Sequence, residues 1–87
     1  MALADLPNRR YNLSGVDIDG NAIEMVFSIS KKLYRCPGCR GSIPIGSEHV
    51  LLRITPPGGS RFHQHWHRDC VQKVKREIRA PHPRPVT

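Results

Sequence analysis

Two short stretches decide the fold of this chain: Cys36-Pro37-Gly38-Cys39 and His67-Arg68-Asp69-Cys70. In each stretch two residues separate the candidate metal ligands, and 27 residues lie between the stretches. Zinc prefers four tetrahedral sulfur and nitrogen ligands, and three thiolates with one imidazole are a common structural set. The proline and glycine allow a tight turn that points both sulfurs inward, as in a zinc knuckle. We therefore predict one structural Zn²⁺ held by Cys36, Cys39, His67 and Cys70.

The fourth ligand has an alternative. His63, His65 and His67 alternate along a predicted strand, so their side chains fall on one face. His67 has the two-residue gap to Cys70, and His65 is the main competitor. Four protein ligands fill the coordination sphere, whereas a catalytic zinc keeps one position open for water. Because no carboxylate has a motif-like spacing that would make it a general base, we expect no catalytic residues and no enzyme activity.

Length and composition favour a single domain that needs a metal. The chain has 87 residues, of which 38% are apolar and only 6% aromatic, so its core is small. Three cysteines cannot all pair as disulfides within one chain. The sequence has no secretory n-region followed by an apolar segment, and no run of membrane-spanning length. We expect a cytoplasmic protein that has no membrane partner and no small-molecule substrate.

The positive charge is concentrated in the second part of the chain. Residues 1–30 have two arginines and four acidic residues, a net charge of −2. Residues 31–87 have twelve basic and three acidic residues, a net charge of +9. This distribution favours a polyanionic partner, although a solvated basic face would look the same.

The pattern predicts a small α+β domain stapled by zinc, with a treble-clef-like order of elements. Residues 1–9 are expected to be a flexible lead-in, and residues 10–33 an N-terminal β-hairpin packed on the zinc module. The zinc-binding module spans residues 34–79 and contains the knuckle, a second β-hairpin and a C-terminal helix. Alternating prolines in residues 80–87 predict an extended, proline-rich tail.

Apolar periodicity and turn residues place these elements. Alternation predicts strands over residues 11–18, 23–29 and 49–54, with a bulge at Gly15 and a turn at Asp19-Gly20. Residues 61–66 return as the fourth strand, with Trp66 facing the core. Asp69 is a candidate N-cap for a helix that ends near Arg79. The predicted apolar stripe of that helix consists of Val71, Val74 and Ile78.

The zinc stretch resembles the zinc finger of poly(ADP-ribose) polymerases. The matching residues are Cys36, Cys39, Ser42, Ile43, Pro44, Trp66, His67 and Cys70. The chain is also similar to short, largely uncharacterised actinobacterial proteins with a Cys-Pro-Gly-Cys knuckle and a His-Trp-His-x-x-Cys ending. That similarity implies a bacterial protein, for which association with the nucleoid or with the ribosome stays open. The first resemblance, over about residues 34–75, implies binding to DNA ends and nicks. The chain departs from that finger at Val71 and Gln72, where aromatic residues are usual, and has one finger with no catalytic domain.

Two functions remain open at this point. The first is nucleic-acid binding, with DNA favoured over RNA, through basic side chains on phosphates and aromatic rings on bases. The candidate contact residues are Arg61, Phe62, Lys73, Lys75, Arg76, Arg79, Lys31, Lys32 and Tyr34. The second is a protein-interaction adaptor that docks on a larger nucleic-acid-processing complex such as RNA polymerase or the ribosome.

Overall fold

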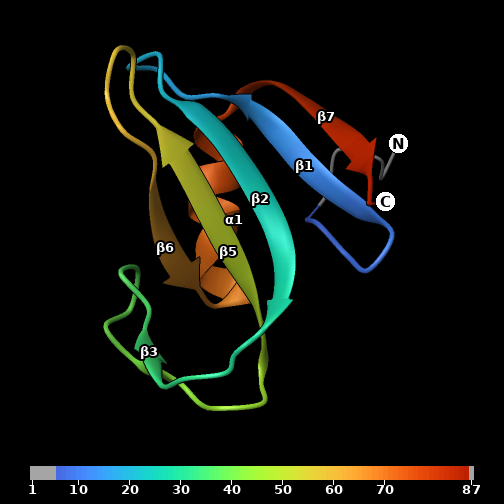
Figure 1. Ribbon diagram of the computed structural model, residues 1–87, viewed down its shortest axis with the longest axis vertical. Coiled ribbons are helices and arrows are strands. Elements are labelled where there is room, and N and C mark those ends of the chain that lie inside the picture. Colours follow the sequence, from blue (N-terminus) through green and yellow to red (C-terminus); the bar gives the residue numbers. More distant parts are fainter. Residues whose placement is uncertain (1–5, 87) are drawn as a thin grey trace.

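The computed structural model describes residues 6–86, which form one helix and seven strands in an α+β arrangement (Figure 1). The elements are β1 (Tyr11–Val16), β2 (Ala22–Ile29), β3 (Tyr34–Arg35), β4 (Ser42–Ile43), β5 (Glu48–Thr55), β6 (Phe62–Trp66), α1 (Arg68–Glu77) and β7 (Arg79–Pro85). The predicted α+β class is confirmed. Within residues 6–86, no helix has the length and apolar character that a membrane crossing requires.

Five strands make one antiparallel sheet in the order β6-β5-β2-β1-β7. β2 and β5 pair over their whole length, from Ala22 opposite Thr55 to Ile29 opposite Glu48. Their alternate apolar side chains face α1, which lies across one face of the sheet (Figure 1). The core consists of Leu13, Ile23, Met25, Val50, Leu52, Ile54, Val71 and Ile78. The predicted inward faces of the two central strands and of the helix are therefore confirmed.

The bulge predicted at Gly15 is present in the ladder between β1 and β7. The register shifts between Ser14 and Val16 on the β1 side. A Cβ atom at Gly15 would overlap the side chain of Ile78 and lie 2.9 Å from the carbonyl oxygen of Arg79. Glycine is needed here because the turn from α1 into β7 passes directly over it. At the β1–β2 turn, Gly20 has φ +84°, as predicted for an Asp-Gly turn.

The segment that the sequence predicts as a proline-rich tail forms most of strand β7. The sequence predicts an extended tail from residue 80, and the structure shows an extended strand that pairs with β1 from Arg79 to Pro85. The N–H of Val86 donates to the carbonyl oxygen of Arg10 at 2.8 Å. Prolines 81, 83 and 85 lie at alternate positions of this edge strand, so their missing N–H groups fall on the side away from β1. The segment is thus part of the sheet.

The lead-in and the helix ends also differ from the predictions. Residues 1–5 lie outside the described residues, but Leu6 packs against the core and Pro7 is buried, so residues 6–7 are not loose. The helix N-cap is His67 rather than Asp69, which lies in the first turn, where a carboxylate favours the helix dipole. The helix ends at Glu77, because Ile78 is already extended.

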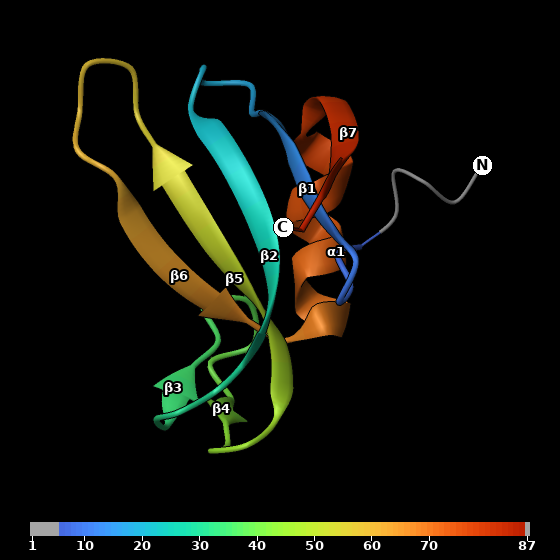
Figure 2. The same cartoon turned by 45° about the vertical axis from the view of Figure 1, so that its right-hand side comes forward.

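The predicted knuckle lies at one end of the sheet. β3 and β4 pair with each other, Tyr34 opposite Ile43, on either side of the Cys36–Cys39 turn. We call residues 34–43 the knuckle segment. It lies near the end of the sheet where β6 leads into α1 (Figure 2). The face of the sheet opposite α1 is called the outer face below.

Candidate metal centre

The structure brings together the four side chains that the sequence predicts as ligands. The sulfur atoms of Cys36, Cys39 and Cys70 and a ring nitrogen of His67 all lie within 4.8 Å of one another. Two of them come from the knuckle segment, one is the N-cap of α1, and one lies in its first turn. All three cysteines are free thiols. This centre has the donor set and the spacing to hold a metal ion.

Local backbone geometry points the knuckle sulfurs inward. The N–H of Cys36 donates to the carbonyl oxygen of Gly41 at 2.9 Å, and the N–H of Arg40 donates to that of Cys36 at 2.8 Å. Arg40 has φ +62°, which closes the turn, and the N–H of Gly41 donates to the sulfur of Cys39 at 3.3 Å. Backbone N–H groups that point at sulfur stabilise the thiolate form that a metal requires.

His67 is oriented by a hydrogen bond on the far side of its ring. Nε2 lies 2.9 Å from the carbonyl oxygen of Ser42, which can only accept, so Nε2 carries the proton. Nδ1 then presents its lone pair to the sulfurs, 3.2 Å from that of Cys39 and 3.8 Å from that of Cys70. A carbonyl that fixes the tautomer and ring orientation of a histidine is the usual support of a metal ligand.

The thiols perturb one another's ionisation. Burial raises the pKa of Cys36, but the backbone N–H groups of His67, Cys39 and Gly38 lower it to about 7 in total. Burial, the hydrogen bonds that the Cys70 S–H donates to the sulfurs of Cys39 and Cys36, and the negative charge of those two groups when ionised raise the pKa of Cys70 to about 12. Without a cation the three sulfurs cannot all ionise at neutral pH, and a divalent ion would remove that repulsion.

Trp66 closes the centre on the core side. Its ring packs against the hydrophobic core, and its indole N–H donates to the side-chain oxygen of Gln64 at 3.0 Å. A Cβ atom at Gly38 would lie 2.7 Å from the Trp66 ring and 3.1 Å from the Cβ of Cys70. Glycine at this position lets the knuckle approach both the tryptophan and the helix.

His65, the alternative fourth ligand, takes part in a different cluster. Its ring stacks on Tyr34 with centroids 3.5 Å apart, and its Nδ1 lies 2.7 Å from Nε2 of His49. His49 is fully buried, and burial lowers the pKa of both histidines, so both are neutral at pH 7. This cluster attaches the knuckle segment to the outer face. Sequence reasoning missed His49, although a histidine within a strand of alternating apolar residues was a signal of a position that can be buried.

The candidate nucleic-acid contacts do not form one surface. Lys73 and Arg76 line a hollow on α1 beside Gly38 and Cys70, while Lys31 and Lys32 are exposed near the knuckle. Lys75 is half-buried on the helix, and Arg79 is exposed at the start of β7. These residues are spread over three parts of the molecule.

The two aromatic candidates, Phe62 and Tyr34, lie apart from the basic ones. Phe62 pairs with the core residue Ile54 and so faces the helix side of the sheet, whereas Arg61 lines a groove on the outer face. One ring face of Tyr34 is covered by His65. Arg61 and Phe62 therefore lie on opposite faces of the sheet, because neighbours in an extended chain point in opposite directions.

A sequence profile of the Rv1322 family matches residues 21–72, which include the four-residue centre. Relatives include the uncharacterised proteins Rv1322 of Mycobacterium tuberculosis (strain H37Rv) and Mb1356 of Mycobacterium bovis. Each is 44% identical to this chain over 52 residues, which are 58% of this chain and 51% of the relative. The chain thus spans about half the length of the curated relatives it matches. No solved structure matches it.

Proposed function

The chain belongs to the Rv1322 family, and we propose that its cysteine–histidine centre binds one structural Zn²⁺. The observation that carries this proposal is the mutual approach of the four ligand atoms to within 4.8 Å, with Nδ1 of His67 presented to the sulfurs. Thiolate and imidazole ligands suit zinc, and four of them complete a tetrahedron. With no open position for water, the ion supports the fold and catalyses nothing. Residues 34–79 are then a treble-clef-like zinc module.

Zinc stoichiometry with two matched histidine variants tests the assignment. Native mass spectrometry should find one zinc per chain in the wild type and in His65→Gln, and none in His67→Gln. Cys70→Ser should also lose the ion. Equal zinc in the two histidine variants, or a full equivalent retained by Cys70→Ser, would show that these residues are not the ligands.

We propose further that the zinc-stapled domain binds nucleic acid, with DNA favoured over RNA. The support is the formal charge of +7, carried mostly by residues 31–87. Contacts between basic side chains and phosphates release counterions from the nucleic acid, so the binding affinity falls steeply as the salt concentration rises. Titration of a labelled oligonucleotide between 50 and 200 mM salt is the test. Affinity that does not change with salt, or no binding at the lowest salt, would contradict the proposal.

The protein-interaction adaptor stays a second candidate because of an apolar region near the knuckle. Leu33 is 66% exposed and Ile45 is 70% exposed, and solvated positions rarely carry two such side chains this close to one site. An adaptor would cover them with a partner protein of a larger complex. Recovery of one defined protein after nuclease treatment, lost in a Leu33→Ser, Ile45→Ser variant, favours this candidate.

A further inference from the structure

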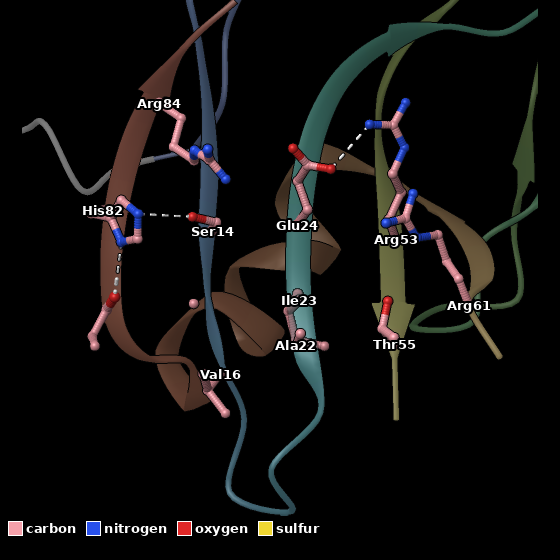
Figure 3. Close-up of a pocket in the computed structure, with 12 residues that line it drawn as sticks. Ser14, Val16, Ala22, Ile23, Glu24, Arg53, Thr55, Arg61, His82 and Arg84 are labelled. Atoms are coloured by element: carbon pink, nitrogen blue, oxygen red, sulfur yellow. Dashed lines mark hydrogen bonds and ion pairs between the residues drawn. The ribbon is translucent and has the colours of Figure 1, made fainter. Parts of the chain in front are cut away.

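The outer face of the sheet carries a groove that no ligand of the metal centre enters. The groove has a volume of about 390 Å³. Six of the side chains that line it, drawn in Figure 3, are Ser14, Glu24, Arg53, Arg61, His82 and Arg84. We call it the outer-face groove.

The groove has cationic walls and a floor of small residues. His82 and Arg84 project from β7 on one side, and on the other side Arg53 projects from β5 and Arg61 from the residue just before β6 (Figure 3). Between the walls, β1 and β2 contribute small lining residues such as Ser14, whose hydroxyl lies 3.2 Å from Nε2 of His82. Since β7 and β5 are three strand spacings apart, the walls are separated by about 14 Å at the backbone.

The charge of the groove is only partly compensated. Among residues 6–86, Glu24 is its one acidic lining residue, and it is already paired with Arg53, Oε1 to a guanidinium nitrogen at 3.0 Å. Arg61 and Arg84 have no ion-pair partner among residues 6–86. Two unpaired guanidinium groups that face a common hollow from opposite sides attract an anion that can span between them.

The path of positive charge continues beyond the groove. A second hollow of about 360 Å³ shares Arg53 with it and runs on to Arg9, Asn12 and Phe27. Arg9 forms an exposed ion pair with Glu48, a guanidinium nitrogen to Oε2 at 3.7 Å, and its guanidinium carbon lies 5.9 Å from the centroid of the Phe27 ring. The buried Oδ1 of Asn12 has no hydrogen-bond partner within residues 6–86. Cations at intervals along an extended track suit a linear polyanion better than a compact anion.

We propose that the outer-face groove binds a single strand of nucleic acid through its phosphates. The inference rests on the proposed nucleic-acid function and moves the contact surface from the helix to the outer face. A trough about 14 Å wide admits one strand, and among residues 6–86 no Phe, Tyr or Trp side chain lines the main groove to read bases. Binding is therefore independent of base sequence and governed by the salt concentration.

Fluorescence anisotropy with a labelled ten-residue oligothymidylate tests the proposal on the zinc-loaded chain. The double variant Arg61→Gln, Arg84→Gln should weaken binding at least about tenfold at 50 mM salt. It should also make the log–log salt slope shallower by about 1.4, since each phosphate contact on a single strand contributes about 0.7. Glu24→Gln should tighten binding several-fold, because it removes the one carboxylate and releases Arg53.

The control is Lys73→Gln, Arg76→Gln on the helix, which should bind within twofold of the wild type. The opposite result, in which only the helix variant loses binding, would overturn the groove proposal and leave the proposed nucleic-acid function standing. No binding by the wild type at low salt overturns both proposals. Equally tight binding of a ten-residue oligoglutamate would show that the groove holds acidic chains in general, which also overturns the inference. Unchanged zinc content and melting temperature establish that the variants are folded.

Discussion

Removal of the metal should unfold the knuckle segment and leave the five-stranded sheet in place. The reason is that the two parts have separate sources of stability. Cys36 and Ile43 are buried, yet neither belongs to the core that joins the sheet to α1. That core holds eight buried side chains from β1, β2, β5, α1 and the residue after α1, none of them a metal ligand.

The magnitude follows from what holds residues 34–43 in place. Fixing the backbone of these residues costs about 10–20 kcal/mol in conformational entropy. Burial of Ile43 contributes about 1.5–3 kcal/mol, the stack of Tyr34 on His65 about 0.5–1.5, and each backbone hydrogen bond of the segment about 0.5–1.5. The shortfall is on the order of 10 kcal/mol, and structural zinc supplies about 10–16 kcal/mol. We therefore expect the segment to be ordered only when the proposed ion is bound.

Hydrogen exchange measured by mass spectrometry, before and after chelation, resolves the two parts. The backbone amides of Cys36, Arg40 and Gly41 should lose protection when the metal is removed, while those of β2 and β5 should keep it. A His82→Gln variant, altered far from the centre, serves as the control and should respond as the wild type does. The reasoning is refuted if the knuckle amides stay protected without metal, or if β2 and β5 lose protection at the same rate.

Three further outcomes follow from single positions. Gly38→Ala should lower the free energy of unfolding by about 1–3 kcal/mol and weaken zinc binding, because the new Cβ would lie 2.7 Å from the Trp66 ring; chelator competition and thermal melting check this. Gly15→Ala should destabilise by a similar amount with zinc affinity unchanged, since the new methyl group meets Ile78 far from the centre, so a loss of zinc there would contradict the assignment. Zinc affinity should fall as pH falls, and the number of protons released per ion should increase by about one to two between pH 8 and 6. In that range Cys36, with a pKa of about 7, becomes protonated, and so does His67, whose pKa is raised by its hydrogen bond to the carbonyl oxygen of Ser42; calorimetry in buffers of different ionisation enthalpy measures it.

The ligands could be predicted because their spacing is local. Two residues between paired ligands fix which side chains meet on a turn or a helix start, whatever the rest of the chain does. The choice between His65 and His67 was harder, because both lie on one face of an ideal strand. It depends on where β6 ends: the strand stops at Trp66, so His67 becomes the N-cap and turns toward the sulfurs.

The sheet could be predicted only in part, because pairing between distant segments leaves little trace in the sequence. Alternation identifies β2 and β5, whose inward faces are apolar. β7 has no such alternation, since its inner positions are prolines, and nothing local indicates that it pairs with β1. The outer-face groove escaped prediction for the same reason. Arg84 and Arg61 are far apart in the sequence, and they line the same groove only because of the order of the strands in the sheet.

The pairing of β1 with β7 also bears on how fast the chain folds. It joins Tyr11 to Pro85, and the metal centre closes a shorter loop, from Cys36 to Cys70, nested inside that long one. An ion bound early would cut the free chain between β1 and β7 from 74 to roughly 40 residues. By loop-closure entropy this speeds their meeting about 2.5-fold. Zinc would then act during folding as well as in the folded protein, because it shortens the free chain that must close before β7 can pair with β1.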